Sequence, residues 1–280
     1  MGVISHSPVS LRVGTTGLRN WASTQQVSYS EVTSSKDPQI YRNAGQGDPG
    51  FLVVSWPELL DVEKLTSNNQ LAIGLHPTPL PLGRGRHPLH WTLAMGLKRL
   101  VLSFFALDSG VDTGDVLLRL SAKLNGTETL EALMDLHDSL ARVGAEKLGD
   151  WITQGRPIKG TPQDENETTW RKRTEHDITI DFRMSSRSIK NLVRSFGQPF
   201  DGCRVLTGVG PLSIESCEIL TNITQVDEWQ VPGKIVFCDE NKLVVRSGDG
   251  LVRLSIRPSE NWRVFRNARE RFLHPPSFYG

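Results

Sequence analysis

Cysteine is scarce in this sequence: its 280 residues include three cysteines, Cys203, Cys217 and Cys238. Their number is odd and no two of them form a CxxC pair. This spacing excludes a disulfide framework and a cysteine-based zinc site of any common type. Buried free thiols are typical of proteins in a reducing compartment.

An excess of charge of one sign is also lacking. The chain has 32 Lys and Arg against 31 Asp and Glu, a formal net charge of +1. This balance creates no strong field towards nucleic acid or an acidic membrane. No apolar run approaches the roughly 20 residues that a membrane-spanning helix needs, and the N-terminus lacks the basic-then-apolar pattern of a signal peptide. We therefore expect a cytoplasmic protein without a membrane partner.

Regular structure is predicted to begin near Gly50. Residues 1–46 are polar, rich in Ser and Thr, and show no sustained period, so we expect a poorly ordered N-terminal segment. Downstream, apolar runs alternate with helical patterns, which implies a parallel sheet flanked by helices. Strands are predicted at 51–55, 71–75, 100–106 and 116–120, and helical stretches after Pro57, after Pro88 and over 130–152.

The C-terminal part has a different pattern. Residues 155–173 have the composition of a linker, and a short helix is predicted over 186–196. Residues 247–250 (SGDG) form a strong hairpin signal between two apolar segments. Short strands of this kind close naturally into a compact β barrel or sandwich. The predicted strands are 212–217, 234–237, 243–246 and 251–256.

Two loops carry residue types suited to catalysis. His76 follows the strand 71–75, and Asp112 lies in a loop that follows the strand 100–106. If both strands are parallel, both loops leave carboxyl ends of strands, where open α/β sheets place their ligands. A carboxylate beside a histidine orients the imidazole and stabilises its charged form, so this pair could transfer protons.

Each of these residues alone also has a simpler interpretation. A His before Pro is commonly a turn residue bonded to a backbone carbonyl, and an Asp beside Gly commonly forms a turn. Arg84 and Arg86 could be solvated loop charges. His87 and His90 together with His76 match no common zinc spacing and have no acidic ligand nearby, so we expect no metal.

Taken together, the motifs resemble a known family. Residues 76–98 (HPTPLPLGRGRHPLHWTLAMGLK) and 103–119 (SFFALDSGVDTGDVLLR) are similar to the catalytic core of the 10-formyltetrahydrofolate-dependent formyltransferases. That family includes enzymes that formylate methionyl-tRNA and enzymes that N-formylate amino-sugar nucleotides. Residues 175–205 are similar to the start of its C-terminal domain, and the RGRHPL loop is similar to that of formyltransferases of surface-polysaccharide biosynthesis.

The resemblance covers roughly residues 50–256 and implies an α/β fold. We expect a Rossmann-like parallel sheet as the formyltransferase core over 47–154, with its N-terminal strands short or missing. A linker, 155–173, would lead to a small OB-like β-barrel domain over 174–280. The oligomeric state stays open, a homodimer included.

The resemblance also implies site residues. His76 is expected to assist proton transfer and to hydrogen-bond the developing oxyanion, and Asp112 to support His76 and help remove the amine proton. Arg84 and Arg86 could grip a diphosphate, or else be solvated or paired with carboxylates. The 10-formyltetrahydrofolate site would be lined by Ser55, Trp56, Thr78, Pro79, Leu80 and Pro81.

One departure from the family concerns Gly74, which occupies the position of the family's catalytic Asn. An amide donor to an oxyanion is worth about 2.7–4 kcal/mol, so a backbone N–H, Asn68 or Asn69 would have to replace it. We expect a formyltransferase acting on a primary amine of a nucleotide-linked amino sugar. The alternatives are methionyl-tRNA as acceptor, with tRNA as a partner, and a weak or inactive relative that serves as a binding module.

Overall fold

The computed structural model describes residues 2–6, 16–42, 50–66, 70–221, 230–268 and 272–273. The chain forms two compact units. The first lies within residues 1–84, 101–120 and 140–169, and the second within 85–100, 121–139 and 170–280. Both are discontinuous in sequence, because four strands and one long helix contribute residues to each. The predicted boundaries at 46, 154 and 173 divide the chain differently and stay a prediction.

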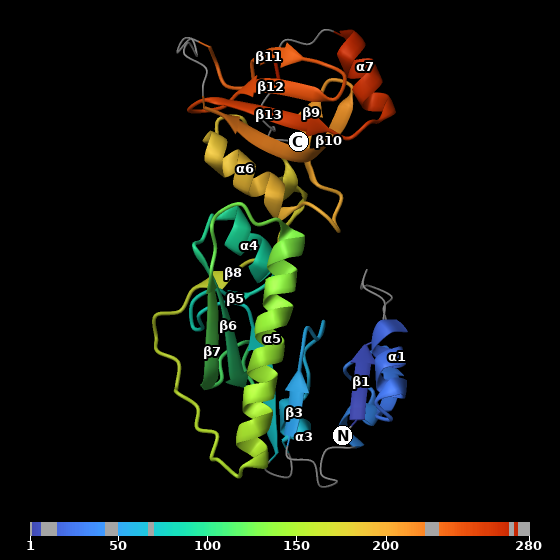
Figure 1. Ribbon diagram of the computed structural model, residues 1–280, viewed down its shortest axis with the longest axis vertical. Helices are drawn as coiled ribbons and strands as arrows, with labels where there is room; N and C mark the ends of the chain where they lie inside the picture. Colours follow the sequence, from blue (N-terminus) through green and yellow to red (C-terminus); the bar gives the residue numbers. More distant parts are fainter. Residues whose placement is uncertain are drawn as a thin grey trace. The chain divides into compact units, whose positions relative to one another are not determined.

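A four-stranded sheet forms the centre of the first unit (Figure 1). Its order is β3 (Gly50–Val53), β4 (Leu71–His76), β6 (Arg99–Ala106) and β7 (Val116–Lys123), and α3 (Val62–Leu65) connects the first two strands. Ile73, Leu102 and Phe104 of the sheet pack with Leu148 of the helix α5 (Leu130–Thr153). The α/β fold class is thereby confirmed.

Strand direction differs from the expectation at one pair. β3 and β4 are parallel, but β4 and β6 are antiparallel, with Ile73 opposite Ala106 and His76 opposite Ser103. Alternating strands and helices do not encode this, because direction depends on the side to which each connection returns the chain. The carboxyl ends of β4 and β6 therefore lie at opposite ends of the pair.

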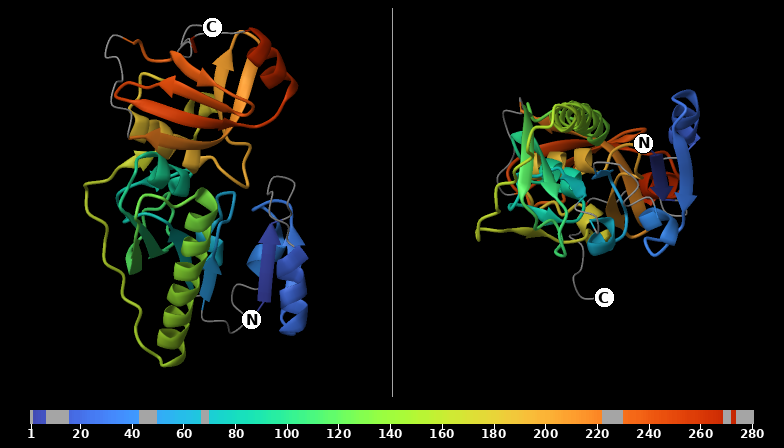
Figure 2. Two further views of the ribbon diagram at one scale, coloured as in Figure 1. Left: turned by 45° about the horizontal axis from the view of Figure 1, so that its top comes forward. Right: turned by 90° about the horizontal axis from the view of Figure 1, so that it is seen from below.

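The N-terminal segment is folded, so the expectation of a poorly ordered segment is wrong for its described residues. β1 (Gly2–His6) and β2 (Ser28–Val32) pair in parallel, and α1 (Thr16–Thr24) lies between them in the sequence (Figure 2). The short helix α2 (Pro38–Arg42) follows β2. Val32 and Ile40 are buried against Leu65 and Ala72. These strands are short and contain several serines, so their apolar pattern is weak and burial comes from contacts distant in sequence.

The second unit is built on a five-stranded antiparallel sheet, which confirms the small C-terminal β region. Ile189 and Val193 of the helix α6 (Ser186–Ser195) belong to its apolar core. Ser185 is the N-cap residue of α6, and its side chain accepts a hydrogen bond from the Ser188 amide. The sheet order is β11 (Ile235–Cys238), β12 (Lys242–Arg246), β13 (Leu251–Ile256), β10 (Gly210–Leu220) and β9 (Cys203–Thr207).

The short elements of this unit include the predicted features. The hairpin between β12 and β13 closes with a hydrogen bond from the Ser247 amide to the Gly250 carbonyl, as expected. The helix after Pro88 is α4 (Pro88–Ala94), and it stops before Gly96 as expected. The sequence did not indicate the 3₁₀ helix η1 (Glu175–Ile178) or α7 (Glu260–Ala268).

Most of the segment expected to be a linker belongs to the first unit. Thr161 and Val116 exchange backbone hydrogen bonds of 2.9 Å. Further along, β8 (Thr169–Trp170) pairs with β5 (Arg84–Gly85). In the part of the chain that the structure describes, no helix is long and apolar enough to cross a membrane.

Candidate active site

His76 and Asp112 are neighbours at the end of β4. The Nδ1 atom of His76 lies 3.5 Å from Oδ2 of Asp112, and the two side chains are 7% and 18% exposed. The Nε2 atom of His76 donates a hydrogen bond of 2.8 Å to the Gly83 carbonyl. Both ring nitrogens thus face oxygen atoms, and the doubly protonated ring could donate to both. The arrangement can hold and pass on a proton at Nδ1.

The loop 107–115 brings Asp112 to His76 by folding back. Ala106, the last residue of β6, donates its amide to the Asp115 carbonyl at 2.9 Å. A side chain at Gly114 would place its Cβ only 1.8 Å from the Ala106 carbonyl oxygen, so this turn requires glycine. Asp112 has a φ of 57°, a left-handed conformation that Asp tolerates better than most residues. The predicted pair therefore forms, although β4 and β6 are antiparallel.

Gln163 holds this loop in place and was missed by the sequence analysis. Its Nε2 donates to the carbonyls of Asp112 at 2.9 Å and Gly114 at 2.7 Å. Its Oε1 accepts from Nη2 of Arg84 at 2.8 Å. A single Gln inside a linker-like segment gives no motif or periodic signal, so only the folded chain shows this contact.

The segment 78–81 is held by hydrogen bonds from β6 and β7. Ser103 on β6 donates its hydroxyl to the Thr78 carbonyl at 2.6 Å, and Arg119 on β7 donates to the Leu80 carbonyl. The Thr78 hydroxyl oxygen is buried and has no hydrogen-bond partner among the described residues. A buried polar atom without a partner is costly, so this oxygen marks a place where a ligand could bond.

The structure places the other predicted site residues as follows. Ser55 follows β3, where Val53 pairs with Gly74, so it lies beside the His76 end of β4. Trp56 donates its indole N–H to Ser35 at 2.7 Å and packs in the apolar cluster of Val32 and Ile40. These roles in folate binding stay predictions.

The two predicted arginines differ. Arg84 forms an ion pair with Glu167 in addition to its bonds with Gln163. The side chain of Arg86 is exposed, and its amide donates to the Trp170 carbonyl. Pairing with a nearby carboxylate was the alternative considered for Arg84, and the phosphate role of both residues stays a prediction.

Gly74 has no space for the family's amide. A Cβ at this position would lie 2.7 Å from a Leu107 methyl and 2.9 Å from the Phe105 ring, and the φ of Gly74 is not in the left-handed region. The side chains of β6 and its loop therefore fill this position. Asn68 and Asn69, named as replacements, lie outside the described residues.

A second histidine cluster, in the other unit, is built around Arg173. His90 donates from Nδ1 to the Ser195 carbonyl at 2.6 Å, and its Nε2 accepts from Nη2 of Arg173 at 3.2 Å. Nε of Arg173 donates to Nδ1 of His87 at 3.0 Å, and its guanidinium lies 4.1 Å from the Phe196 ring centroid.

Electrostatics make this second cluster unsuitable for proton exchange. Burial, and then the charge of Arg173, lower the pKa of His90 to about 3. Burial also lowers the pKa of Arg173 to about 10, and its Nη1 has no partner among the described residues. Within those residues, no three His, Cys, Asp or Glu side chains are grouped to hold a metal ion.

Comparison with known families gives this geometry its context. A family model described as formyl transferase matches residues 21–144, and one described as formyl transferase, C-terminal domain, matches residues 172–261. The chain belongs to the formyl transferase family. The predicted resemblance is confirmed, and the chain is a formyltransferase by family. The first match begins inside the N-terminal segment expected to be poorly ordered.

Three relatives of this formyltransferase illustrate the likeness. Methionyl-tRNA formyltransferase of Caldanaerobacter subterraneus subsp. tengcongensis is 27% identical over 222 residues, which cover 78% of this chain and 69% of that protein. WlaRD, a sugar 3N-formyl transferase, has a TM-score of 0.69 at 15% identity and covers 92% of this chain and 88% of its own.

A third relative is the N-formyltransferase from Helicobacter canadensis, in complex with folinic acid and dTDP-3-aminofucose. Its TM-score is 0.64 at 14% identity, and it covers 86% of this chain and 82% of its own. At such identities, the likeness of both solved structures to this chain shows a common fold.

Proposed function

We propose that this formyltransferase passes a formyl group from 10-formyltetrahydrofolate to a primary amine. The observation that carries the proposal is the contact between His76, at the end of β4, and Asp112, in the loop 107–115. Nδ1 of His76 and Oδ2 of Asp112 lie 3.5 Å apart. The unpartnered Thr78 hydroxyl beside them fits a site completed by a ligand. WlaRD and the Helicobacter canadensis enzyme were both solved with folate compounds.

Each side chain has a role in this chemistry. The formyl-folate supplies an activated carbonyl carbon for attack by the amine. Asp112 accepts the proton that the amine loses as its nitrogen bonds to the formyl carbon, and it orients the ring of His76. The bond between the formyl carbon and N10 of the folate then breaks, and N10 takes up a proton, so that tetrahydrofolate leaves. His76 donates a hydrogen bond to the oxygen that gains negative charge. Since Nε2 of His76 is bonded to Gly83, this donation requires one of the two ring contacts to open.

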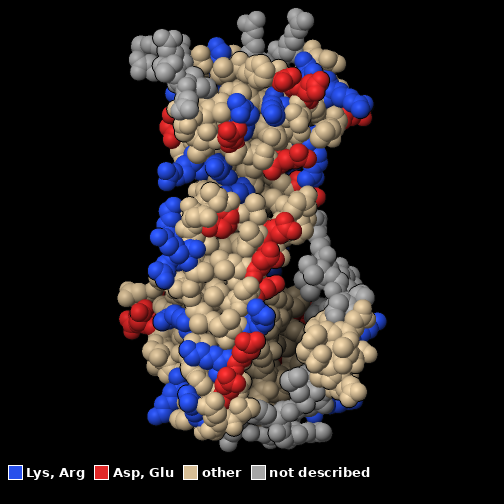
Figure 3. All heavy atoms as spheres, in the orientation of Figure 1, with Lys and Arg blue, Asp and Glu red and all other residues tan. Residues whose placement is uncertain are grey.

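We further propose a nucleotide-linked amino sugar as the acceptor. The solved complex with dTDP-3-aminofucose supports this choice by fold. A tRNA-binding surface needs clustered Lys and Arg. On the face seen in Figure 3, basic and acidic side chains lie side by side over the C-terminal β region, and the whole chain is nearly neutral. The cytoplasmic location and a homodimer stay predictions.

Arg84 is the residue proposed to meet the diphosphate. Arg84 lies in the loop that follows His76. Its guanidinium donates a hydrogen bond to Gln163 and forms an ion pair with Glu167. A bound phosphate would take the place of the Glu167 carboxylate on the guanidinium of Arg84, because both anions fit its planar pair of N–H donors. Arg84→Ala should therefore raise KM for the sugar nucleotide much more than KM for the folate, and equal effects on both would contradict this role.

A competition assay tests the proposal. Initiator methionyl-tRNA and a panel of nucleotide-linked amino sugars are offered together with formyl-folate at near-physiological salt. We expect a formylated amino sugar as the main product. Formylated methionyl-tRNA, which the 27% identity to a methionyl-tRNA formyltransferase makes the second candidate, would overturn the acceptor. No transfer to any amine, with folate binding retained, would show an inactive binding module.

A further inference from the structure

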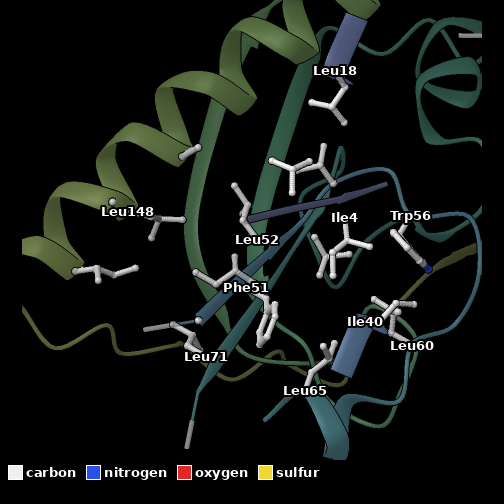
Figure 4. Close-up of a pocket in the computed structure, with 18 of the residues that line it drawn as sticks. Ile4, Leu18, Ile40, Phe51, Leu52, Trp56, Leu60, Leu65, Leu71 and Leu148 are labelled. Carbon is white, nitrogen blue, oxygen red and sulfur yellow. The ribbon is translucent and has the colours of Figure 1, made fainter. Parts of the chain in front are cut away.

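A large apolar cavity lies in the first unit, but it holds no polar partner for His76. Its volume is about 960 Å³, and Figure 4 shows apolar side chains around it, among them Ile4 and Leu148. No charged residue is among the described residues that line it, and His76 does not line it either. The polar contacts of His76 come instead from Gly83, in the loop that follows it, and from Asp112, in the loop 107–115.

The two ring nitrogens of His76 face oxygen atoms at different distances. Nε2 lies 2.8 Å from the Gly83 carbonyl oxygen, which can only accept, so Nε2 carries a hydrogen. Nδ1 lies 3.5 Å from Oδ2 of Asp112, beyond the usual length of an N–H···O hydrogen bond. A neutral imidazole has one N–H, and the shorter contact decides its position. In neutral His76 the hydrogen is therefore on Nε2, and the lone pair of Nδ1 faces Asp112.

Thr168 holds Gly83 on both sides of its Cα atom. The Gly83 amide donates to Oγ1 of Thr168 at 2.8 Å. The Gly83 carbonyl belongs to the next peptide unit, whose N–H is that of Arg84, and this amide donates to the Thr168 carbonyl at 3.0 Å. The Thr168 amide donates in turn to the Pro81 carbonyl at 3.3 Å. One residue, 85 positions after Gly83, thus fixes the loop that receives the His76 ring.

Gly83 depends on this support because glycine does not fix its own backbone. Its φ is 74°, in the left-handed region, and without a Cβ the residue also adopts other conformations readily. A rotation about Gly83 would turn its carbonyl away from Nε2 of His76. The Thr168 hydroxyl opposes this rotation, because Gly83 is buried and an amide without an acceptor there is costly.

Asp112 attracts the same hydrogen towards the other nitrogen. A charged acceptor forms a stronger hydrogen bond than a carbonyl does, so the carboxylate favours a hydrogen on Nδ1 of His76. The Gly83 carbonyl favours a hydrogen on Nε2. The position of the hydrogen therefore depends on how firmly Gly83 is held, and the Thr168 hydroxyl supplies one of the two bonds from Thr168 that hold it.

We propose that Thr168 is a positioning residue for His76. By holding Gly83, it keeps the ring hydrogen on Nε2 and reserves Nδ1 for proton exchange with Asp112. This role rests on the proposed formyl transfer, in which Asp112 accepts the amine proton. That proton passes from the carboxyl group to the lone pair of Nδ1 and back, and no other group gains or loses a proton in this step. A hydrogen already on Nδ1 of the neutral ring would block the exchange.

Nitrogen NMR of the full chain with isotope-labelled histidines reports which ring nitrogen carries the hydrogen. The His76 signals are those lost in His76→Gln, and the spectra are recorded at alkaline pH, where histidine rings are neutral. We expect the hydrogen on Nε2 in the parent protein and a mixture of both tautomers in Thr168→Val, which lacks the hydroxyl. Thr168→Ser retains the hydroxyl and should resemble the parent.

Steady-state kinetics supplies the second readout, with Thr169→Val as the matched control. Thr168→Val should lower kcat roughly tenfold, because the ring proton is misplaced, and KM for the folate should not change. Thr168→Ser should restore most of kcat. Thr169 is the next residue, lies in β8 and is exposed like Thr168, so Thr169→Val should leave both kcat and the His76 spectrum unchanged.

Several outcomes would overturn the proposal. These are an unchanged tautomer in Thr168→Val, a loss of kcat in Thr168→Ser as large as that in Thr168→Val, and an equal effect of Thr169→Val. A change of tautomer that leaves kcat unaltered would also overturn it. If the parent protein transfers no formyl group to any amine, the proposed function fails, and the spectra still decide whether Thr168 sets the position of the hydrogen on His76.

Discussion

His76 and His90 are both buried histidines beside a charged residue, yet the two charges have opposite signs. The ring of His76 faces a carbonyl and the carboxylate of Asp112. The ring of His90 donates to one carbonyl and accepts from the guanidinium of Arg173. A second proton on His90 would point at the N–H groups of Arg173, so that ring stays neutral. The sign of the neighbouring charge therefore separates a ring that faces a carboxylate from one that serves only as a fixed structural acceptor.

The largest expected effect tests the catalytic side of this comparison. His76→Ala should lower kcat for formyl transfer by roughly 10²–10⁴-fold, because a positioned acid–base group contributes that much. His90→Gln should leave kcat within a few-fold of the parent. Steady-state kinetics of both variants measures the contrast.

Coupling of the pair is checked with Asp112. The double variant His76→Ala with Asp112→Ala should cost little more than the worse single variant, because the two side chains act as one unit. Losses that simply add would show two independent roles and remove the basis of the comparison.

Arg173 tests the structural side. Arg173→Ala leaves acceptor nitrogens of His87 and His90 without a donor and uncovers the Phe196 ring. The free energy of unfolding should fall by about 2–3 kcal/mol, measured by urea denaturation. Arg187→Ala, an exposed arginine on α6, is the matched control and should change stability by less than about 0.5 kcal/mol. A stable Arg173→Ala protein would mean that the cluster is held together by other contacts.

The pH dependence of stability follows from His90. Its pKa is about 3 in the folded protein, below the ordinary value of 6.5, so the unfolded chain binds the proton more tightly. Stability from this residue is complete above the ordinary pKa and is lost as the pH falls, by about 2 kcal/mol between pH 7 and pH 5. Asp177, with a pKa of about 2 against 3.8, loses its contribution only below about pH 4.

Urea denaturation at pH 7, 6 and 5 measures this fall. It should shrink in His90→Gln, which retains an amide for the Ser195 contact but does not titrate. A fall of the same size in the variant would assign the pH dependence to other groups, and the contrast between the two histidines would lose its electrostatic support.

Gly74→Asn tests whether the family's amide can be restored beside His76. Because Leu107 and Phe105 fill the space around Gly74, the new side chain should overpack the sheet and lower the free energy of unfolding by about 1–3 kcal/mol. Thermal denaturation measures this change. A variant that is as stable as the parent and faster in formyl transfer would show that the two side chains move aside.

The smallest expected effect concerns Gln163, a positioning residue. Gln163→Ala removes both hydrogen bonds to the Asp112 loop and should lower kcat about tenfold through misplacement of the carboxylate. Gln163→Glu keeps the length but cannot donate, so it should behave like the alanine variant. Gln154→Ala, an exposed residue just after α5, should be silent. A change in KM alone would place the role of Gln163 in substrate binding through Arg84.

Much of the architecture could be predicted because its signals are local. The apolar runs of β4, β6 and β7, the long period of α5 and the SGDG hairpin each depend on residues close together in sequence. The motifs around His76 and Asp112 predicted that these two residues form a pair. They did so although one step of the argument, the parallel direction of β4 and β6, was wrong.

Tertiary structure decided what depends on contacts between distant residues. Such contacts place Gln163 on the carbonyls of the Asp112 loop, Phe105 and Leu107 in the space around Gly74, and Arg173 against His90. They also order the serine-rich strands β1 and β2, whose own pattern is too weak to predict them. The amino-acid sequence by itself determined which side chains could exchange a proton. The neighbours brought by the fold decided that His76 meets a carboxylate and His90 a guanidinium, because charge and burial act through space rather than along the chain.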